Sequence, residues 1–142
     1  MPSLTDHPAV GKVLSIDDDH VIFNPAATNY ELKLVTGVTY SGPVNQRIEC
    51  LIRTAARKVY TVPSGGNFIA PIFGPPRTIQ GRILYADDRN LVIKAGTPVI
   101  VELPLTEDAV DLAVGGLRVG AIANVIALPG ARFELVPVTS EK

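Results

Sequence analysis

Hydrophobic and polar residues alternate along this chain in short stretches separated by turns, which is the pattern of a β-sheet protein. In residues 30–35 (YELKLV), the hydrophobic side chains of Tyr30, Leu32 and Leu34 alternate with charged ones, as in a half-buried strand. Residues 47–53 (RIECLIR) alternate in the same way. Stretches rich in valine, isoleucine and phenylalanine predict further strands at residues 58–63, 67–73, 79–86, 90–96, 98–104, 121–129 and 131–138.

One stretch of the chain occurs twice. Residues 11–23 read GKVLSIDDDHVIF, and residues 81–93, 70 positions later, read GRILYADDRNLVI without a gap. The glycine, the leucine and two aspartates coincide, and each copy has the order strand, acidic turn, strand. We therefore interpret the chain as two related β units, at residues 10–74 and 75–138, with an N-terminal arm at 1–9 and a C-terminal tail at 139–142.

Two such units of about seventy residues, rich in valine and isoleucine, favour small closed barrels. The units differ in the middle, where residues 106–114 (TEDAVDLAV) predict one to two helical turns. Thr106 is a suitable N-cap, and Gly115 and Gly116 would end the helix. The predicted fold class is all-β, with two pseudo-repeated small β-barrel units and one short helix in the second.

The charge balance excludes a general electrostatic attraction to nucleic acid or to an acidic membrane. The 142 residues include 13 basic and 14 acidic side chains, for a net charge of −1. A single cysteine excludes an intrachain disulfide, and no stretch approaches the roughly 18 apolar residues of a membrane span. The N-terminus does not have the composition of a secretory signal, so we expect a soluble, cytoplasmic protein; a virion or another assembly is equally compatible.

Two predicted strands are hydrophobic on both faces. Residues 21–23 (VIF) and 91–93 (LVI) would leave one face exposed in an open sheet. Either the two units bury these faces against each other or a second chain covers them. We expect a homo-oligomer or an assembly with other protein subunits.

Conventional catalytic and metal-binding patterns are not present in the sequence. The chain has two histidines and one cysteine, and Cys50 stands in a hydrophobic strand where a thiol is usually inert. The acidic clusters at residues 17–20 (DDDH) and 87–90 (DDRN) are typical of tight turns. We therefore predict a protein that is not an enzyme and has no cofactor or metal.

A basic cluster is the strongest candidate for contact with a charged partner. It comprises Arg47, Arg53, Arg57 and Lys58, with Tyr60 close by. OB-type barrels bind single-stranded nucleic acids with aromatic side chains beside a cationic groove. A solvated strand face or a contact with an acidic protein surface is the alternative explanation of the cluster.

The second half resembles the TOBE class of small oxyanion-binding barrels, and the tandem arrangement resembles the molbindins. The residues that carry the likeness are GRIL (81–84), VIVELPLT (99–106), EDAVDL (107–112), GLRVG (116–120) and NVIAL (124–128).

The resemblance implies OB/TOBE-like barrels and binding of molybdate, tungstate or phosphate. Where the family carries its ligand segments this chain reads PPRTIQ and ALPGA, and the nearest candidate ligands are Arg77, Thr78 and Thr106.

The sequence thus predicts a non-catalytic β-barrel binding or assembly module. A small oxyanion-binding protein and a single-stranded nucleic-acid-binding protein are the alternatives.

Overall fold

The computed structural model describes residues 5–37, 40–104, 110–111 and 117–135. These residues form twelve strands and no helix, so the all-β prediction is confirmed for this part of the chain. The strands are β1 (Ala9–Ile16), β2 (His20–Pro25), β3 (Glu31–Val35), β4 (Arg47–Val62), β5 (Phe68–Ala70), β6 (Phe73–Gly74), β7 (Thr78–Ala86), β8 (Asn90–Lys94), β9 (Pro98–Glu102), β10 (Val110–Asp111), β11 (Ile122–Ala127) and β12 (Arg132–Leu135).

Strand β3 shows how the alternating pattern becomes a half-buried strand. Leu32 and Leu34 are fully buried, whereas Glu31 and Lys33 point to solvent. Successive side chains of a strand point to opposite faces, so the leucines share the face that packs on the core. The strand predicted at residues 30–35 is therefore observed.

The two copies of the repeated stretch form hairpins with the same register. In the first hairpin Val13 pairs with Phe23, and in the second Ile83 pairs with Ile93, each residue standing 70 positions after its counterpart. Both hairpins shift register immediately afterwards, between Val13 and Ser15 and between Ile83 and Tyr85. The hairpins are thus equivalent in pairing, while an origin by duplication stays an interpretation.

A glycine opens each copy because the partner strand passes too close for a side chain. A Cβ atom at Gly11 would collide with the carbonyl oxygen of Asn24, and one at Gly81 would collide with that of Lys94. The coinciding glycines therefore have the same steric role in the two hairpins.

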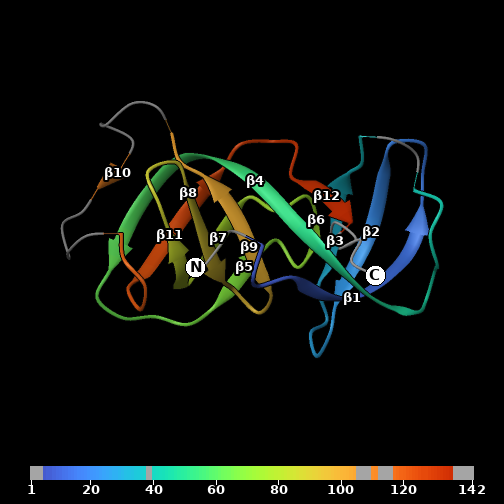
Figure 1. The fold of residues 1–142 in the computed structure, drawn as a ribbon, viewed down its shortest axis with the longest axis horizontal. Helices are drawn as coiled ribbons and strands as arrows, with labels where there is room; N and C mark the ends of the chain where they lie inside the picture. Colours follow the sequence, from blue (N-terminus) through green and yellow to red (C-terminus); the bar gives the residue numbers. More distant parts are fainter. Residues whose placement is uncertain (1–4, 38–39, 105–109, 112–116, 136–142) are drawn as a thin grey trace, which may run out of the picture.

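Strand β4 is 16 residues long and crosses most of the molecule (Figure 1). Its first half pairs with β1 and β12, its centre runs parallel to β9, and its second half pairs with β11. Two separate strands were predicted here, at residues 47–53 and 58–63. They form one strand because no glycine or proline stands between them.

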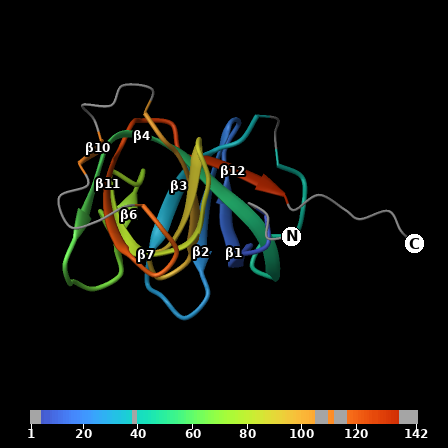
Figure 2. The ribbon, with the colours of Figure 1, turned by 60° about the vertical axis from the view of Figure 1, so that its left-hand side comes forward.

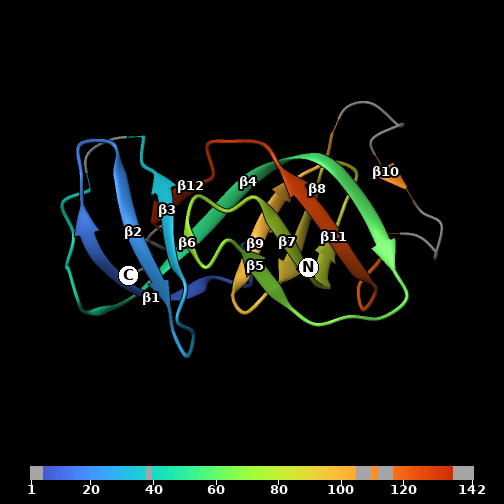
Figure 3. The same ribbon diagram turned by 180° about the vertical axis from the view of Figure 1, so that it is seen from behind.

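The strand pairings form two closed circuits that share β4. One circuit runs through β1, β2, β3, β12 and β4 and back to β1. The other runs through β7, β8, β9, β4 and β11 and back to β7. Strand β12 follows β11 in the sequence but pairs in the first circuit, beside β3, as Figure 3 shows from behind.

The pairings therefore cross residue 74, where the first predicted unit ends. Residues before that boundary contribute β4 to the second circuit, and residues after it contribute β12 to the first. The two halves of the sequence consequently do not make two separate sheets.

The hydrophobic residues form a large core and a small second cluster. The large core includes Phe23, Ile79 and Phe133 and extends through both circuits. The second cluster consists of Leu51, Val92 and Ile100, which are at most 2 % exposed. Val92 is the central residue of residues 91–93, whose second face was expected to be covered either within the chain or by a second chain, and a single chain already buries it.

The helix predicted at residues 106–114 is wrong where the structure describes it. Val110 and Asp111 form β10, which pairs in parallel with β4 at Val59 and Tyr60. A helix of one to two turns is only marginally stable in water, so pairing with β4 overrides the local preference. The other residues of this segment, including Thr106, lie outside the described residues.

The segment predicted as one strand at residues 67–73 forms two short strands instead. Strand β5 pairs with β7, and β6 pairs with β3. Pro71 separates them, and the peptide bond between Ala70 and Pro71 is cis. The segment thus leaves one circuit and reaches the other within a few residues.

Candidate functional sites

The titratable residues of this chain do not gather into a metal site in the part that the structure describes. No group of three or more histidine, cysteine, aspartate or glutamate side chains is placed to hold an ion there. Cys50 is fully buried, and desolvation raises the pKa of its thiol to about 12. A thiol in this environment stays protonated at neutral pH and is a poor nucleophile.

The acidic turns use their carboxylates to fix the backbone. Asp17 accepts a hydrogen bond from the amide of Asp18 at 2.9 Å. Asp87 accepts hydrogen bonds from the amides of Arg89 and Asn90, both at 2.8 Å. A hydrogen bond from the Tyr85 hydroxyl is the main cause that lowers the pKa of Asp87, and those backbone amides add to it. These are the local bonds that aspartate is expected to form in a tight turn.

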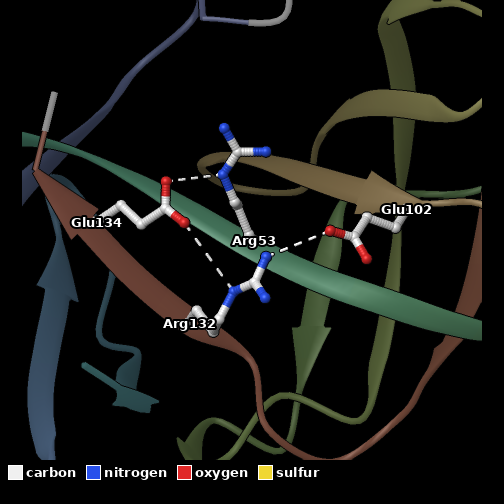
Figure 4. Close-up of polar contacts among 4 residues, drawn as sticks. All are labelled: Arg53, Glu102, Arg132 and Glu134. Carbon is white, nitrogen blue, oxygen red and sulfur yellow. Dashed lines mark hydrogen bonds and ion pairs between the residues drawn. The ribbon is translucent and has the colours of Figure 1, made fainter. Parts of the chain in front are cut away.

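Four charged side chains form a network where β12 meets β4 (Figure 4). The Nε atom of Arg53 lies 2.8 Å from Oε1 of Glu134, and a guanidinium nitrogen of Arg132 lies 3.2 Å from Oε2 of Glu102. Arg132 also lies 4.0 Å from Glu134. The network joins β4, β9 and β12 and has no net charge, since two arginines face two glutamates.

The basic cluster predicted from the sequence is not one surface. Arg53 is held by Glu134, whereas Arg47, Arg57 and Lys58 are exposed. Arg47 pairs with β1 and Lys58 with β11, so the two lie in different circuits. At about 3.3 Å per residue, the strand separates them by up to roughly 35 Å.

Tyr60 is half-buried and pairs with both β10 and β11. The basic residues that are close to Tyr60 in the sequence therefore do not form a row of exposed cations around its ring. The predicted cluster is dispersed along β4.

The three residues predicted as oxyanion ligands are not brought together either. Arg77 is exposed beside a cavity of about 260 Å³ whose other described lining residues are four prolines and one alanine. The amide of Arg77 is already donated to the carbonyl of Ala70 at 2.9 Å. Thr78 is half-buried at the start of β7, and Thr106 lies outside the described residues.

An apolar cavity of about 550 Å³ lies between the loop after β3 and the end of β12. The rings of Tyr40 and Phe133 meet edge to face with centroids 5.4 Å apart. The hydroxyl of Tyr40 donates to the carbonyl of Pro43 at 2.8 Å, which fixes the ring against its own loop. Leu135 completes the apolar wall and is 57 % exposed.

Strand β12 has a free edge beside this cavity. Arg132 pairs with Val35 of β3, but residues 133–135 pair only with β4 among the strands that the structure describes. In the view of Figure 2 the arrowhead of β12 lies beyond β1, β2 and β3. The cavity and the free edge thus lie side by side.

Sequence reasoning did not single out Tyr40, Phe133 or Leu135. Tyr40 stands in a loop rich in glycine and proline, and Phe133 stands in a predicted strand about ninety positions later. The one available signal was a bulky aromatic residue inside a turn-forming segment. Their meeting depends on the long-range pairing of β12 with β4, which no local pattern encodes.

Comparison with known proteins gave no match to a family model, to a curated protein or to a solved structure. The resemblance of the second half to TOBE-class barrels therefore stays a prediction. No described segment is a helix long and apolar enough to cross a membrane.

Proposed function

We propose that this chain is a non-catalytic binding module that takes up an extended segment of another protein at the free edge of β12. The observation that carries the proposal is the combination of that edge with the apolar cavity beside it. We interpret the two circuits of five strands, which have β4 in common, as two interleaved barrels of the OB type.

A free strand edge offers backbone N–H and C=O groups to a second chain. An added strand gains main-chain hydrogen bonds from the edge, and pockets beside the edge select its side chains. In this molecule the next strand would take the place beyond Val35, where β3 ends. One hydrophobic side chain of the added strand would then enter the cavity between Tyr40 and Leu135.

The cavity has the size and lining of a site for a hydrophobic group. Its volume of about 550 Å³ lies within the range of roughly 300–1,000 Å³ for binding pockets. Covering Leu135, which is 57 % exposed, would contribute about 1 kcal/mol. The neighbouring Arg132 and Glu134 are paired with other side chains, so the entrance favours an uncharged segment.

The proposed partner is another protein subunit or a second copy of this chain. The strands that are hydrophobic on both faces give little support for such a partner, because one chain buries Val92 fully and Ile22 partly. The free edge of β12 and the exposed Leu135 are the features that favour a protein partner.

Single-stranded nucleic acid is a less favourable ligand, because the basic residues predicted to bind it are dispersed along β4. Oxyanion binding at Arg77 and Thr78 is equally disfavoured, since Arg77 has mainly prolines around it.

The proposal is tested by NMR titration of the whole chain with a capped hydrophobic peptide, acetyl-Thr-Val-Leu-Val-amide. We expect saturable shifts of the amides of Phe133, Glu134 and Leu135, with a dissociation constant of about 1 mM. A capped Thr-Ser-Gly-Ser peptide should cause no such shifts. Light scattering on the same samples reports the mass against the 15.1 kDa of one chain.

Leu135→Asp is expected to abolish binding of the hydrophobic peptide. Val119→Asp is the matched control, because Val119 is 64 % exposed and does not line this cavity. Equal binding by both variants, or no saturable shift in the unmodified protein, would count against the proposal.

A further inference from the structure

A separate cavity of about 300 Å³ lies near the other end of β4. Its walls are the last residues of β4, the turn after it, and the turn that leads into β11. Most of the lining is polar, in contrast to the cavity beside β12. Arg82 and Arg118 are the titratable side chains among its described lining residues.

One of these arginines is fixed by the backbone. A terminal nitrogen of Arg82 donates to the carbonyl of Gly120 at 2.8 Å. Gly120 has a φ of +94°, and its own amide is donated to the carbonyl of Ile83 at 2.9 Å. The guanidinium is therefore held beside the turn, while its remaining N–H groups are available to a ligand.

The charge at this cavity is not neutralised by the described part of the chain. Neither Arg82 nor Arg118 forms an ion pair with a described carboxylate. Lys94 on β8 is in register with Arg82 and adds positive charge next to it. Ser64 adds an exposed hydroxyl from the turn after β4.

We propose that this cavity binds the phosphate group of a small ligand, either inorganic phosphate or a phosphomonoester. Arginine guanidinium groups match phosphate oxygens in geometry and bind them through paired, charge-assisted hydrogen bonds. Arg118 and the free N–H groups of Arg82 hold the oxygens, and the hydroxyl of Ser64 donates a further hydrogen bond. The cavity has room for a phosphate group with a small substituent.

This site is independent of the proposed protein-binding edge. It lies in the circuit that contains β7 and β11, whereas the edge belongs to the circuit that contains β3 and β12. It also differs from the sequence-predicted ligands Arg77 and Thr78, which do not line it.

The experiment is an NMR titration of the full chain with sodium phosphate, compared with sodium chloride at the same ionic strength. We expect saturable shifts of the amides of Ser64, Gly65, Gly120 and Ala121 with phosphate and not with chloride. Because the amides of residues 133–135 report the other proposal, failure at one site is distinguishable from failure at the other.

The variants Arg118→Gln and Arg82→Gln should each weaken phosphate binding by about tenfold. Arg77→Gln is the matched control, since Arg77 is exposed outside this cavity, and it should leave binding unchanged. A thermal melt of each variant verifies folding. Since Arg118 is exposed, its variant should melt at the temperature of the unmodified protein.

Adenosine monophosphate and a ten-residue thymidine oligonucleotide complete the comparison. Tighter binding of the monophosphate than of inorganic phosphate assigns the site to a phosphomonoester, and the reverse assigns it to the free ion. Binding of the oligonucleotide alone, equal shifts with chloride, or unaltered binding in Arg118→Gln would each overturn the proposal.

Discussion

Arg53 and Glu134 form an ion pair with a distance of 2.8 Å, although 81 positions separate them in the sequence. The pair joins the centre of β4 to β12, the strand that completes the first circuit from the far end of the chain. Arg132, on the same strand, reaches Glu102 on β9 in the second circuit. The network therefore links the two circuits at the point where they share β4.

Glu134→Gln should reduce the free energy of unfolding by about 1 kcal/mol, because it leaves two neighbouring arginines without their shared carboxylate. Arg53 and Arg132 are paired residues of adjacent strands, so their charges would repel each other. Half-exposed pairs are screened by salt, so the loss should shrink in 1 M sodium chloride. Urea denaturation at low and high salt measures both effects.

The matched comparison for Glu134→Gln is Glu31→Gln, because Glu31 is exposed on β3 and forms none of the ion pairs in the described residues. It should have no effect that depends on salt. A loss of the same size in both variants would show that the network does not stabilise the fold.

Gly11→Ala and Gly81→Ala should each destabilise the protein by about 2 kcal/mol or more, because the new methyl group meets a carbonyl oxygen of the partner strand. The two losses should be similar, since both glycines occupy the same position in equivalent hairpins. Gly66→Ala is the control, because nothing lies within 4 Å of a Cβ atom there. Thermal or urea unfolding gives the comparison, and a neutral Gly81→Ala would contradict the close approach.

Local patterns were sufficient to predict the hairpins and the half-buried strand β3. The alternation at Leu32 and Leu34 is a property of neighbouring residues, and the repeat at residues 11–23 and 81–93 placed two strand pairs in the correct order. Side-chain direction in a strand follows sequence parity, so burial could be predicted in the same step.

Long-range pairing was not predictable in this way. Nothing near Arg132 indicates that β12 belongs beside β3 rather than with the strands that precede it in the sequence. The prediction of the candidate sites from the sequence failed for the same reason. Arg47 and Lys58 are close in sequence but far apart on an extended strand, whereas Tyr40 and Phe133 are far apart in sequence and in contact.

Thr54→Val should raise the free energy of unfolding by about 1 kcal/mol. Thr54 is 3 % exposed, and its hydroxyl has no hydrogen-bond partner in the described structure. An unpaired buried hydroxyl is costly, and valine has nearly the same shape without it. Thr54→Ser is the informative counterpart, because it keeps the hydroxyl and removes the methyl group, and it should lower stability. If the Thr54→Val variant is less stable than the unmodified protein, the hydroxyl of Thr54 must have a hydrogen-bond partner.

Cys50 should make the stability of the protein fall at alkaline pH. Burial raises the pKa of its thiol from 9.0 to about 12, so the folded state keeps the proton that the unfolded state releases. The stabilising contribution is therefore complete below pH 9 and is lost progressively as the pH rises toward 12. Urea denaturation of the unmodified protein and of Cys50→Ala between pH 7 and 11 isolates this contribution from that of other groups. The difference in unfolding free energy should shrink above pH 9, and a difference that stays constant would show that the thiol ionises equally in both states.

A thiol reagent such as 5,5′-dithiobis(2-nitrobenzoate) should correspondingly react with Cys50 only after unfolding, because the folded protein presents a buried, protonated sulfur.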